Sequence, residues 1–383
     1  MSVQAIITAD NHLDPSAINF GPNRGKRRKD HLKCFEEVIE FALKERPEIL
    51  LVGGDLFDSM KPSNATRASV MKLFRSLKEK EIQTFIVSGH HDTPKSIEEG
   101  ASPISIYGKS EYAHFFQNPS SPEILNLKMN GIEIGLAGLS FNPFNLQSEN
   151  PLSNLIFKSK KQFNILLTHY PIQGFGGGFD EDPILPSSIP DNFDIVAAGH
   201  FHKYQSRKIG KTEILYPGST EISSFAEEYD EKGFCWIEFD QKNIISKEFI
   251  KTSARPHKTL EIEYLPELDP MSRIKGQAEK MFDPEIVLRI KIKGNVTADS
   301  LSSYRRSEIL SYCKEKTFHC FVTEDDLIIK RPESIEPLPR TTPLQELERH
   351  FQNLIENANP KEKKIYQKAL VISQSKLQEE GAW

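Results

Sequence analysis

The chain has 383 residues, of which 38% are hydrophobic, and a formal net charge of -5. At about 150 residues per domain this length predicts two or three domains, and the composition allows a packed core and excludes wholesale disorder. The slight acidic excess excludes a protein coated in positive charge, such as a histone-like nucleic-acid binder, although it permits a local basic patch.

The cysteines and the apolar runs indicate the compartment. The four cysteines have no CxxC spacing, which disfavours a disulfide framework or a zinc knuckle and favours a reducing environment. No apolar run is long enough to predict a membrane span, and the N-terminus has no signal-peptide pattern. We therefore expect an intracellular protein without membrane contact, which would be cytoplasmic if its source is prokaryotic.

Strands and helices alternate near the N-terminus. Residues 3–8, 49–52 and 84–87 are short apolar runs typical of buried strands, and 31–46 and 65–80 between them have helical spacing. This alternation indicates an α/β layered domain.

The middle of the chain is richer in strands. Residues 123–129 and 132–136 flank Asn130-Gly131, which predicts a hairpin with a type I′ turn. Further apolar strand patterns follow at 164–168, 194–198, 213–216 and 233–239. We therefore predict an α/β fold with a two-sheet sandwich flanked by helices.

The pattern changes after about residue 250. Residues 1–250 form the predicted first domain, and 258–330 mix strand and helix patterns, which predicts a small separate α+β domain. Residues 331–343 contain four prolines and are typical of a linker. Residues 344–383 predict a charged helical tail with one apolar face.

Five apolar strand patterns each end in a cluster of potential metal ligands. Parallel strands that end at the same sheet edge would bring these clusters together, and alternation along an extended segment points residues two apart the same way. The clusters are Asp10-Asn11-His12, Gly54-Asp55-Leu56-Phe57-Asp58, Gly89-His90-His91-Asp92, His169 and Gly199-His200-Phe201-His202.

The mixture of carboxylates and imidazoles suits first-row divalent ions such as Mn²⁺, Fe²⁺ or Zn²⁺. No thiolate belongs to any cluster, which argues against a structural zinc site. Six or seven ligands are too many for one ion and suit two, and a pair of ions about 3.5–4 Å apart suits cleavage of a phosphoester.

The order of these clusters resembles that of the calcineurin-like metallophosphoesterases, and in particular the Mre-eleven/SbcD DNA-repair nucleases. Lys61-Pro62-Ser63 after the second cluster resembles that branch, as do Tyr216-Pro217-Gly218-Ser219-Thr220 and Lys232-Gly233-Phe234. The resemblance is strong over residues 1–240 and weak over the small domain.

The resemblance implies a role for each cluster. Asp10, His12 and His202 would hold one metal, His169 and His200 the other, and Asp55 would bridge both. His91 would lie beside the scissile phosphate and assist the leaving oxygen as a proton donor or charge stabiliser. The family metal is usually Mn²⁺, so we expect two divalent ions, most simply Mn²⁺.

Position 90 departs from the family pattern. The family has an Asn there, whose amide oxygen is a ligand of the second metal, whereas this chain has His90. Three outcomes are open: His90 substitutes as a ligand, rotates away and leaves a weak second site, or shifts the metal preference. We take His90 as a metal ligand.

Two further carboxylates and a basic run adjoin the clusters. Asp58 and Asp92 are candidates for orienting histidines, with a helix N-cap or a surface turn as the alternative for each. The run 24–29 is predicted to be a loop that tracks a DNA backbone or is simply solvated. Its cations are Arg24, Lys26, Arg27, Arg28 and Lys29.

The remaining expectations concern partners. Residues 173–179 are glycine-rich and predict a mobile entry loop or a connector. The resemblance implies a homodimer through the helices near 65–80 and 98–108, and docking of the C-terminal helices on a Rad-fifty/SbcC-like coiled-coil ABC ATPase. The alternative for the tail is a hairpin folded back on its own domain.

The sequence therefore predicts a metal-dependent DNA nuclease that acts in double-strand-break repair, as an exonuclease on duplex ends and an endonuclease on single strands. One alternative is a phosphodiesterase of nucleotides or small phosphodiesters on the same fold. The other is a scaffold subunit that binds DNA ends with a weakened active site.

Overall fold

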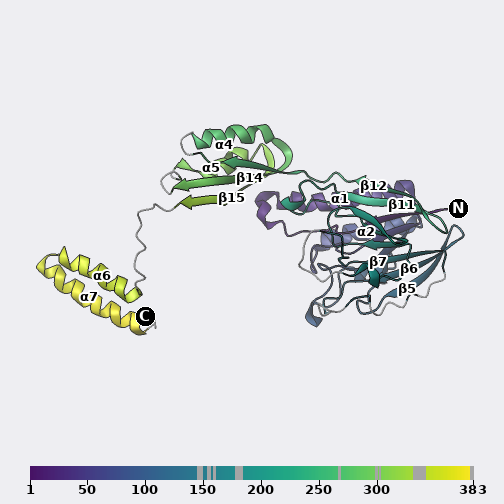
Figure 1. The fold of residues 1–383 in the computed structure, drawn as a ribbon, viewed down its shortest axis with the longest axis horizontal. Helices are drawn as coiled ribbons and strands as arrows, with labels where there is room; N and C mark the ends of the chain where they lie inside the picture. Colours follow the sequence, from purple (N-terminus) through teal and green to yellow (C-terminus); the bar gives the residue numbers. More distant parts are fainter. Residues whose placement is uncertain are drawn as a thin grey trace.

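The computed structural model describes residues 1–144, 150–152, 157, 161–176, 184–265, 269–297, 301, 303–330 and 342–379 (Figure 1). Two six-stranded sheets form the larger part, and a three-stranded sheet and a helical hairpin follow in sequence. This arrangement confirms the predicted α/β class with two large sheets and a helical C-terminal region.

The first sheet has the strand order β12-β11-β1-β2-β3-β4. Strands β1, β2, β3 and β4 run parallel, because helices connect them, whereas β11 and β12 join as an antiparallel edge. The bounds are β1 (Val3–Thr8), β2 (Ile49–Val52), β3 (Gln83–Ile86), β4 (His114–Phe115), β11 (Gly233–Phe239) and β12 (Ile244–Lys251).

The second sheet has the order β5-β6-β7-β8-β10-β9, with β6, β7, β8 and β10 parallel. The bounds are β5 (Glu123–Met129), β6 (Ile132–Leu139), β7 (Phe163–Thr168), β8 (Ile195–Ala198), β9 (Gln205–Ile209) and β10 (Thr212–Tyr216). The turn between β5 and β6 has positive φ at Asn130 and Gly131, as a type I′ turn requires.

A buried apolar core lies between the two sheets, and a second one lies under the helices. The first contains side chains of both sheets, such as Ile7, Leu51 and Leu167. The second joins the outer face of the first sheet to α1 (Arg24–Glu45), α2 (Asn64–Glu79) and α3 (Ser105–Lys109). In the described residues, loop segments and η3 (Pro186–Ser188), rather than α-helices, cover the outer face of the second sheet.

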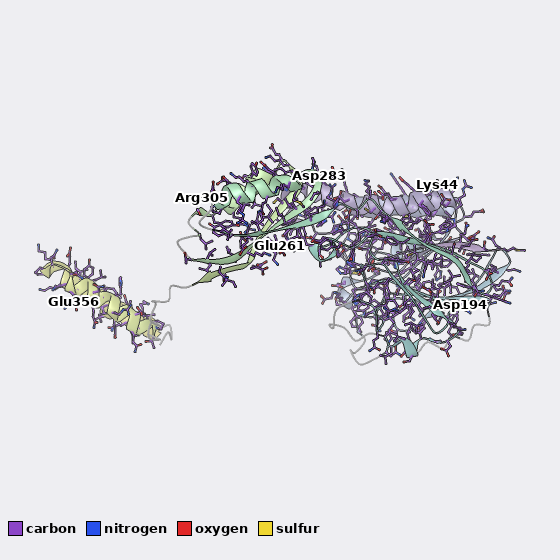
Figure 2. All side chains as sticks on the ribbon, turned by 45° about the horizontal axis from the view of Figure 1, so that its top comes forward. Lys44, Asp194, Glu261, Asp283, Arg305 and Glu356 are labelled. Carbon is purple, nitrogen blue, oxygen red and sulfur yellow. The ribbon has the colours of Figure 1, made fainter. Side chains whose placement is uncertain are left out.

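The third sheet is parallel throughout, in the order β13-β14-β15, and has its own apolar core. Side chains fill the space between its strands and the two helices of this region (Figure 2). The bounds are β13 (His257–Glu263), α4 (Pro270–Ala278), β14 (Asp283–Thr297), α5 (Arg306–Cys313) and β15 (Thr317–Lys330).

The predicted tail consists of two helices that lie side by side, α6 (Pro343–Glu356) and α7 (Pro360–Glu379) (Figure 1). Thr342 and Gln345 form a capping box at the start of α6, which fixes where that helix begins. Residues 331–341 of the predicted linker, and 177–179 of the glycine-rich loop, lie outside the described residues. No helix in the described part of the chain is long and apolar enough to cross a bilayer.

Three predicted elements differ from the structure. Residues 24–29 are not a loop, since α1 begins at Arg24. The helix expected near 98–108 is replaced by the short turns η2 (Ile97–Glu99) and α3. The last strand of the small domain, expected over 326–330 from its apolar residues, is longer: β15 begins at Thr317, and Phe318, Cys320 and Val322 lie buried on its inner face.

Candidate metal centre

The strand register explains why the five clusters meet. In the first sheet Thr8 pairs with Val52 and Val52 with Ile86, so β1, β2 and β3 end at the same level. In the second sheet the ends of β6, β7 and β8 coincide in the same way. The segments that leave these ends place Asp10, His12, Asp55, His90, His91, His169, His200 and His202 at one end of the sandwich.

The backbone at this end is strained. Asp10, His12 and Asp55 have φ between 43° and 49°, and His200 has φ 104°. Non-glycine residues rarely adopt this left-handed region, and where they do they concentrate at functional sites. The strain aims the side chains of the clusters back toward one another instead of along the strands.

His169 lies in the most enclosed part of the centre. Its Nδ1 lies 2.7 Å from the main-chain oxygen of Gly53 and its Nε2 lies 3.3 Å from Oδ2 of Asp55. Burial opposes protonation of His169, but the Asp55 and Asp10 carboxylates raise its pKa to about 10. Burial likewise disfavours the Asp55 carboxylate, and His169 and His12 hold the pKa of Asp55 well below its usual range.

Gly54 and Gly199 are required by close packing around His169. A Cβ at Gly54 would lie 2.4 Å from Nδ1 of His169, and one at Gly199 would lie 2.6 Å from the same atom. Glycine therefore precedes Asp55 and His200 because only hydrogen fits against this imidazole.

A second group of ligand atoms involves His12 and His202. Their Nε2 atoms lie 3.0 Å apart, and Asp10 completes the group. Nδ1 of His202 lies 3.0 Å from Oε1 of Glu227, whose other oxygen pairs with Lys232 at 2.7 Å. Burial opposes protonation of His202, but the Glu227 hydrogen bond raises its pKa. Sequence reasoning missed Glu227, because it lies 25 residues beyond His202 without a motif of its own.

His90 belongs to a third group, with His169 and His200, in which the ligand atoms lie within 4.8 Å of one another. Its ring lies on Phe141, with the centroids 3.6 Å apart, and faces the ring of His200 at 4.7 Å. The His90 ring is therefore gathered with those of His169 and His200 and is not turned away from them. Phe141 was also missed, since an aromatic residue after a strand has no distinguishing spacing.

His91 lies at the edge of the centre with a half-exposed side chain. Its main-chain N–H donates to Oδ1 of Asp55 at 2.8 Å, and its Nδ1 lies 3.0 Å from the main-chain oxygen of Asp58. The Asp58 carbonyl can only accept, so Nδ1 carries the proton and Nε2 is left for a substrate. The ring contacts that of His12, with the centroids 4.7 Å apart.

The two predicted orienting carboxylates behave differently. Oδ1 of Asp58 lies 3.4 Å from Nδ1 of His12, in a position to orient that imidazole. Asp92, by contrast, accepts hydrogen bonds from the main-chain N–H groups of Gly89 and Phe57, so it connects two loops and does not orient a histidine. Burial and the Asp55 charge raise the pKa of Asp92 to about 7.

The donor set fits divalent metal ions. Nε2 of His169 is buried and has no hydrogen-bond partner, although a carboxylate oxygen lies 3.3 Å away. Main-chain and carboxylate acceptors hold Nδ1 of His169 and His202, which directs the lone pairs of both Nε2 atoms inward. Inward lone pairs next to buried carboxylates need a proton or a cation between them, and divalent ions can fill this role.

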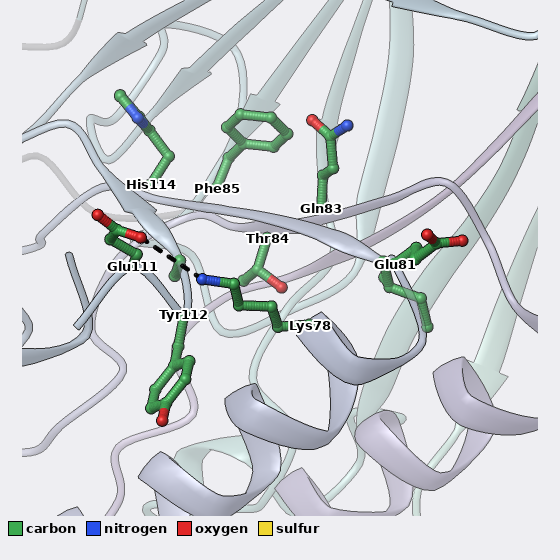
Figure 3. Close-up of a pocket in the computed structure, with 10 residues that line it drawn as sticks. Lys78, Glu81, Gln83, Thr84, Phe85, Glu111, Tyr112 and His114 are labelled. Atoms are coloured by element: carbon green, nitrogen blue, oxygen red, sulfur yellow. Dashed lines mark ion pairs between the residues drawn. The ribbon is translucent and has the colours of Figure 1, made fainter.

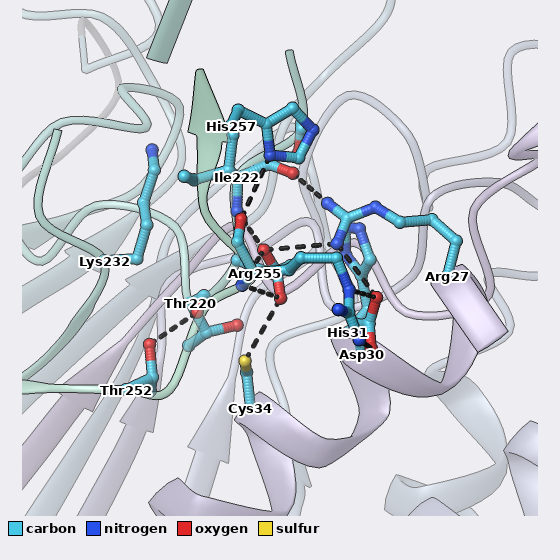
Figure 4. A network of polar contacts seen from close by, with 12 residues as sticks. Arg27, Asp30, His31, Cys34, Thr220, Ile222, Lys232, Thr252, Arg255 and His257 are labelled. Atoms are coloured by element: carbon cyan, nitrogen blue, oxygen red, sulfur yellow. Dashed lines mark hydrogen bonds and ion pairs between the residues drawn. The ribbon is translucent and has the colours of Figure 1, made fainter. Parts of the chain in front are cut away.

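The basic run does not form one surface. Arg24, Lys26 and Lys29 are exposed on α1, but Arg27 is 2% exposed and pairs with Glu221 and Asp30 (Figure 4). Arg28 contacts Asp14 and the main-chain oxygen of Pro15. The expectation that all five cations face solvent is therefore wrong for Arg27. Arg27 lies one helical turn before the buried His31, so its side chain is on the inward face of α1.

The network in Figure 4 joins α1 to the segment before the third sheet. Arg255 forms two hydrogen bonds with Asp30, at 2.7 and 2.9 Å, and a third with Glu285 at 2.8 Å. Glu221 accepts from the main-chain N–H of Arg255 and from Cys34. Arg27 and Glu221 are buried whereas Glu285 is exposed, so the network runs from the interior to the surface and ties these segments together.

A separate pocket lies at the opposite end of the first sheet. It is lined by residues of β3 and by the segment that leads into β4, from Tyr112 to His114, and the Lys78–Glu111 ion pair crosses it (Figure 3). Because β3 is parallel to β1 and β2, its start and the metal centre are at opposite ends of the strands. This pocket therefore takes no part in the site.

Comparison with known proteins agrees with this geometry. The model of the family described as calcineurin-like phosphoesterase matches residues 4–204, just over half of the chain. The chain belongs to the calcineurin-like phosphoesterase family. The matched segment contains every cluster up to His202 and ends before Glu227.

Relatives within this phosphoesterase family confirm the resemblance to the Mre-eleven/SbcD branch. One is the DNA double-strand break repair protein Mre11 of Methanococcus maripaludis, 28% identical over 253 residues, which covers 60% of each chain. The Mre11 of Methanosarcina acetivorans is 26% identical over 324 residues, or 82% of this chain. The chain spans 60% and 49% of the length of these two relatives.

Among solved structures, GAP50, the anchor in the inner membrane complex of Plasmodium, is similar over 66% of this chain and 89% of its own. Its TM-score is 0.42 and its sequence identity 14%.

Proposed function

We propose that this phosphoesterase is a metal-dependent DNA nuclease of double-strand-break repair, which cuts duplex ends as an exonuclease and single strands as an endonuclease. The observation that most directly supports this proposal is the position of His91. Its half-exposed ring lies against His12, and its main-chain N–H bonds Asp55. A hydrogen-bonding group at the open side of a buried metal site is what cleavage of a polymeric phosphodiester needs.

Two divalent ions, with Mn²⁺ as the proposed identity, would be held in two half-sites. Half-site A is formed by Asp10, His12 and His202, and half-site B by His90, His169 and His200; Asp55 lies between them. Bound ions would supply Lewis acidity to a phosphoester and lower the pKa of a nucleophilic water. The chain itself fixes the inward lone pairs through Gly53 and Glu227.

His91 would act on the leaving oxygen. With Nδ1 donating to the Asp58 carbonyl, a protonated Nε2 is directed outward as a donor. The Asp58 carboxylate lies 3.9 Å from Nδ1 of the same ring. His91 is thus proposed to donate a proton to the oxygen that departs from phosphorus.

The choice of DNA over a small phosphodiester rests on the relatives. Both are described as DNA double-strand break repair proteins, and the alignment with the Methanosarcina acetivorans protein extends well beyond the phosphoesterase segment. A small-substrate enzyme needs neither the third sheet nor the α6–α7 hairpin. We therefore propose a nuclease domain at 1–250 and a DNA-capping domain at 258–330, in an intracellular protein.

A panel of substrates tests this proposal. Full-length protein with Mn²⁺ is incubated with end-labelled duplex, circular single-stranded DNA and bis(p-nitrophenyl) phosphate. Degradation of both DNAs supports the nuclease. Hydrolysis of the small ester alone would favour the small-molecule phosphodiesterase, and hydrolysis of none of the three would favour the DNA-binding scaffold.

The partner proposals concern other surfaces. We propose that α6 and α7 bind a Rad-fifty/SbcC-like coiled-coil ATPase, since Ile365, Val371 and Ile372 of α7 are exposed apolar side chains on a helix. Association through α2 into a homodimer is a second proposal. Co-purification with the ATPase, compared with an Ile365→Lys and Val371→Lys variant, and light scattering of the chain alone test the two separately.

A further inference from the structure

The two half-sites differ in donor chemistry. Half-site A combines one carboxylate, Asp10, with two imidazoles, whereas half-site B has three imidazoles and no carboxylate of its own. Asp55 lies close to both, 3.3 Å from Nε2 of His169 and 3.9 Å from Nε2 of His12. The side chain that makes half-site B rich in nitrogen is His90.

We propose that the centre is built for two different ions: a hard cation such as Mn²⁺ in half-site A, and a borderline ion such as Zn²⁺, Co²⁺ or Fe²⁺ in half-site B, with His90 setting that preference. Carboxylate oxygens suit Mn²⁺, whereas imidazole suits the later ions, whose affinity for nitrogen sites exceeds that of Mn²⁺. This inference rests on the metal binding in the proposed function, and not on DNA cleavage.

The surroundings hold His90 in a ligating position. Its ring lies on Phe141 with the centroids 3.6 Å apart. The main chain is held on both sides, since Ser88 accepts from the Phe141 N–H and the His91 N–H donates to Asp55. The preceding residue, Gly89, is fixed against Asp55, because a Cβ there would lie 2.3 Å from Oδ1 of that carboxylate. Small displacements of the His90 backbone are therefore costly, and the imidazole stays at the centre.

The two half-sites also differ in charge. Oδ1 of Asp10 lies 3.9 Å from Nε2 of His169, farther than the 3.3 Å of Asp55, and both Asp10 oxygens accept from the main-chain N–H of His200 at 3.1 Å. Half-site B thus has Asp55 as its nearest counter-charge, at His169, and relies on nitrogen donors for affinity. A site of this kind discriminates between metals by ligand type more than by charge.

The test is metal binding by the full chain without DNA. Metal-free protein is titrated with Co²⁺ and with Zn²⁺ by calorimetry, and the Co²⁺ visible absorption reports the ligand set. We expect two separate steps, with the tighter equivalent in half-site B. His90→Asn should weaken that step by about 10- to 100-fold and change the Co²⁺ spectrum, while the second step is retained.

The matched control is His114→Asn, because His114 is another histidine packed against a phenylalanine ring, but on β4, the edge strand of the first sheet. It should leave both steps unchanged. Wild-type protein is also given one equivalent of Zn²⁺ and then excess Mn²⁺, and elemental analysis should find one ion of each per chain. This measurement uses the wild type alone, so it does not require any variant to fold.

Two outcomes would overturn the inference. One is two equal binding steps in the wild type, and the other is a His90→Asn variant with wild-type Co²⁺ affinity and spectrum. Absence of DNA cleavage by a protein that still binds one Zn²⁺ and one Mn²⁺ would defeat the proposed function and leave the inference intact.

Discussion

Nε2 of His169 faces Oδ2 of Asp55 at 3.3 Å, and both side chains are almost completely closed off from water. A proton or a cation must lie between them, since an imidazole lone pair and a carboxylate oxygen repel each other at this distance. In the metal-free protein these two side chains therefore form a favourable binding site for a divalent ion, at the end of the sandwich where strands of both sheets end.

The first prediction follows from this pair. Divalent ions should raise the melting temperature of the metal-free chain, by a stabilisation of about 2.7 kcal/mol when the free ion exceeds its Kd by 100-fold. Asp55→Asn should abolish most of that shift, because Asp55 contacts both half-sites. Differential scanning fluorimetry with and without Mn²⁺ measures it, and an unchanged shift in the variant would remove Asp55 from the metal centre.

The second prediction concerns Glu227, which holds Nδ1 of His202 at 3.0 Å. Glu227→Gln should weaken the ion of half-site A by about 10- to 100-fold, because the imidazole loses its orienting carboxylate. Calorimetric titration with Mn²⁺ measures the change. Glu231→Gln, at an exposed ion pair four residues away, is the control and should bind normally.

The third prediction separates the cations of α1. Arg27→Met should destabilise the protein by about 3–5 kcal/mol, since it leaves the buried Glu221 carboxylate without its partner. Arg24→Met removes an exposed cation and should change stability by less than about 0.5 kcal/mol. Urea unfolding of both variants decides, and equal stability would mean that the Arg27–Glu221 pair contributes nothing to folding.

The exposed cations give the fourth prediction. Reversing the charge of Arg24, Lys26 and Lys29 should weaken DNA binding and flatten its dependence on salt, because cations that neutralise phosphates bind DNA by releasing counterions. Fluorescence anisotropy at several salt concentrations measures both quantities. An unchanged salt slope would exclude this part of α1 from the DNA contact.

The fifth prediction is a pH dependence of stability at His257. Burial, the Arg27 cation and, more weakly, the Arg255 cation lower the pKa of His257 to about 4 from 6.5, although Glu227 opposes them. The unfolded state therefore binds a proton more readily, so the stabilisation is present above pH 6.5 and is lost as the pH falls toward 4.

The difference is measured against His257→Gln. Unfolding free energies in urea at pH 7.5 and pH 5 should fall more steeply for the wild type than for the variant, by on the order of 1–2 kcal/mol. His31, whose pKa burial also lowers, titrates in both proteins and cancels in the comparison. Parallel pH dependences would show that His257 does not titrate on unfolding.

Much of the site could be predicted because its signals are local. Asp10, Asp55, His169 and His200 each follow a short apolar strand, and parallel strands must end at a common edge. The same strand patterns predicted the two-sheet sandwich, and Asn130-Gly131 predicted the position of its hairpin turn.

The remaining features depend on contacts between distant segments. Glu227 reaches His202, and Arg27 reaches Glu221 across 194 residues, without any sequence spacing that would reveal them. The polarity of Arg27 predicts exposure, but its partner in the loop after β10 overrides that preference by satisfying the buried charge. Asp92 is a similar case: the sequence predicts a carboxylate that orients a histidine, because it does not show that the Asp92 oxygens accept hydrogen bonds from main-chain groups.

The central claim is tested most directly by DNA cleavage in a His91→Ala variant whose metal content is measured on the same sample. Wild-type protein with bound divalent ions should degrade end-labelled duplex DNA, and His91→Ala should retain both ions and cleave about 100- to 1000-fold more slowly. Wild-type protein that holds two ions and leaves the duplex intact, or a His91→Ala variant that cleaves at the wild-type rate, would contradict the account.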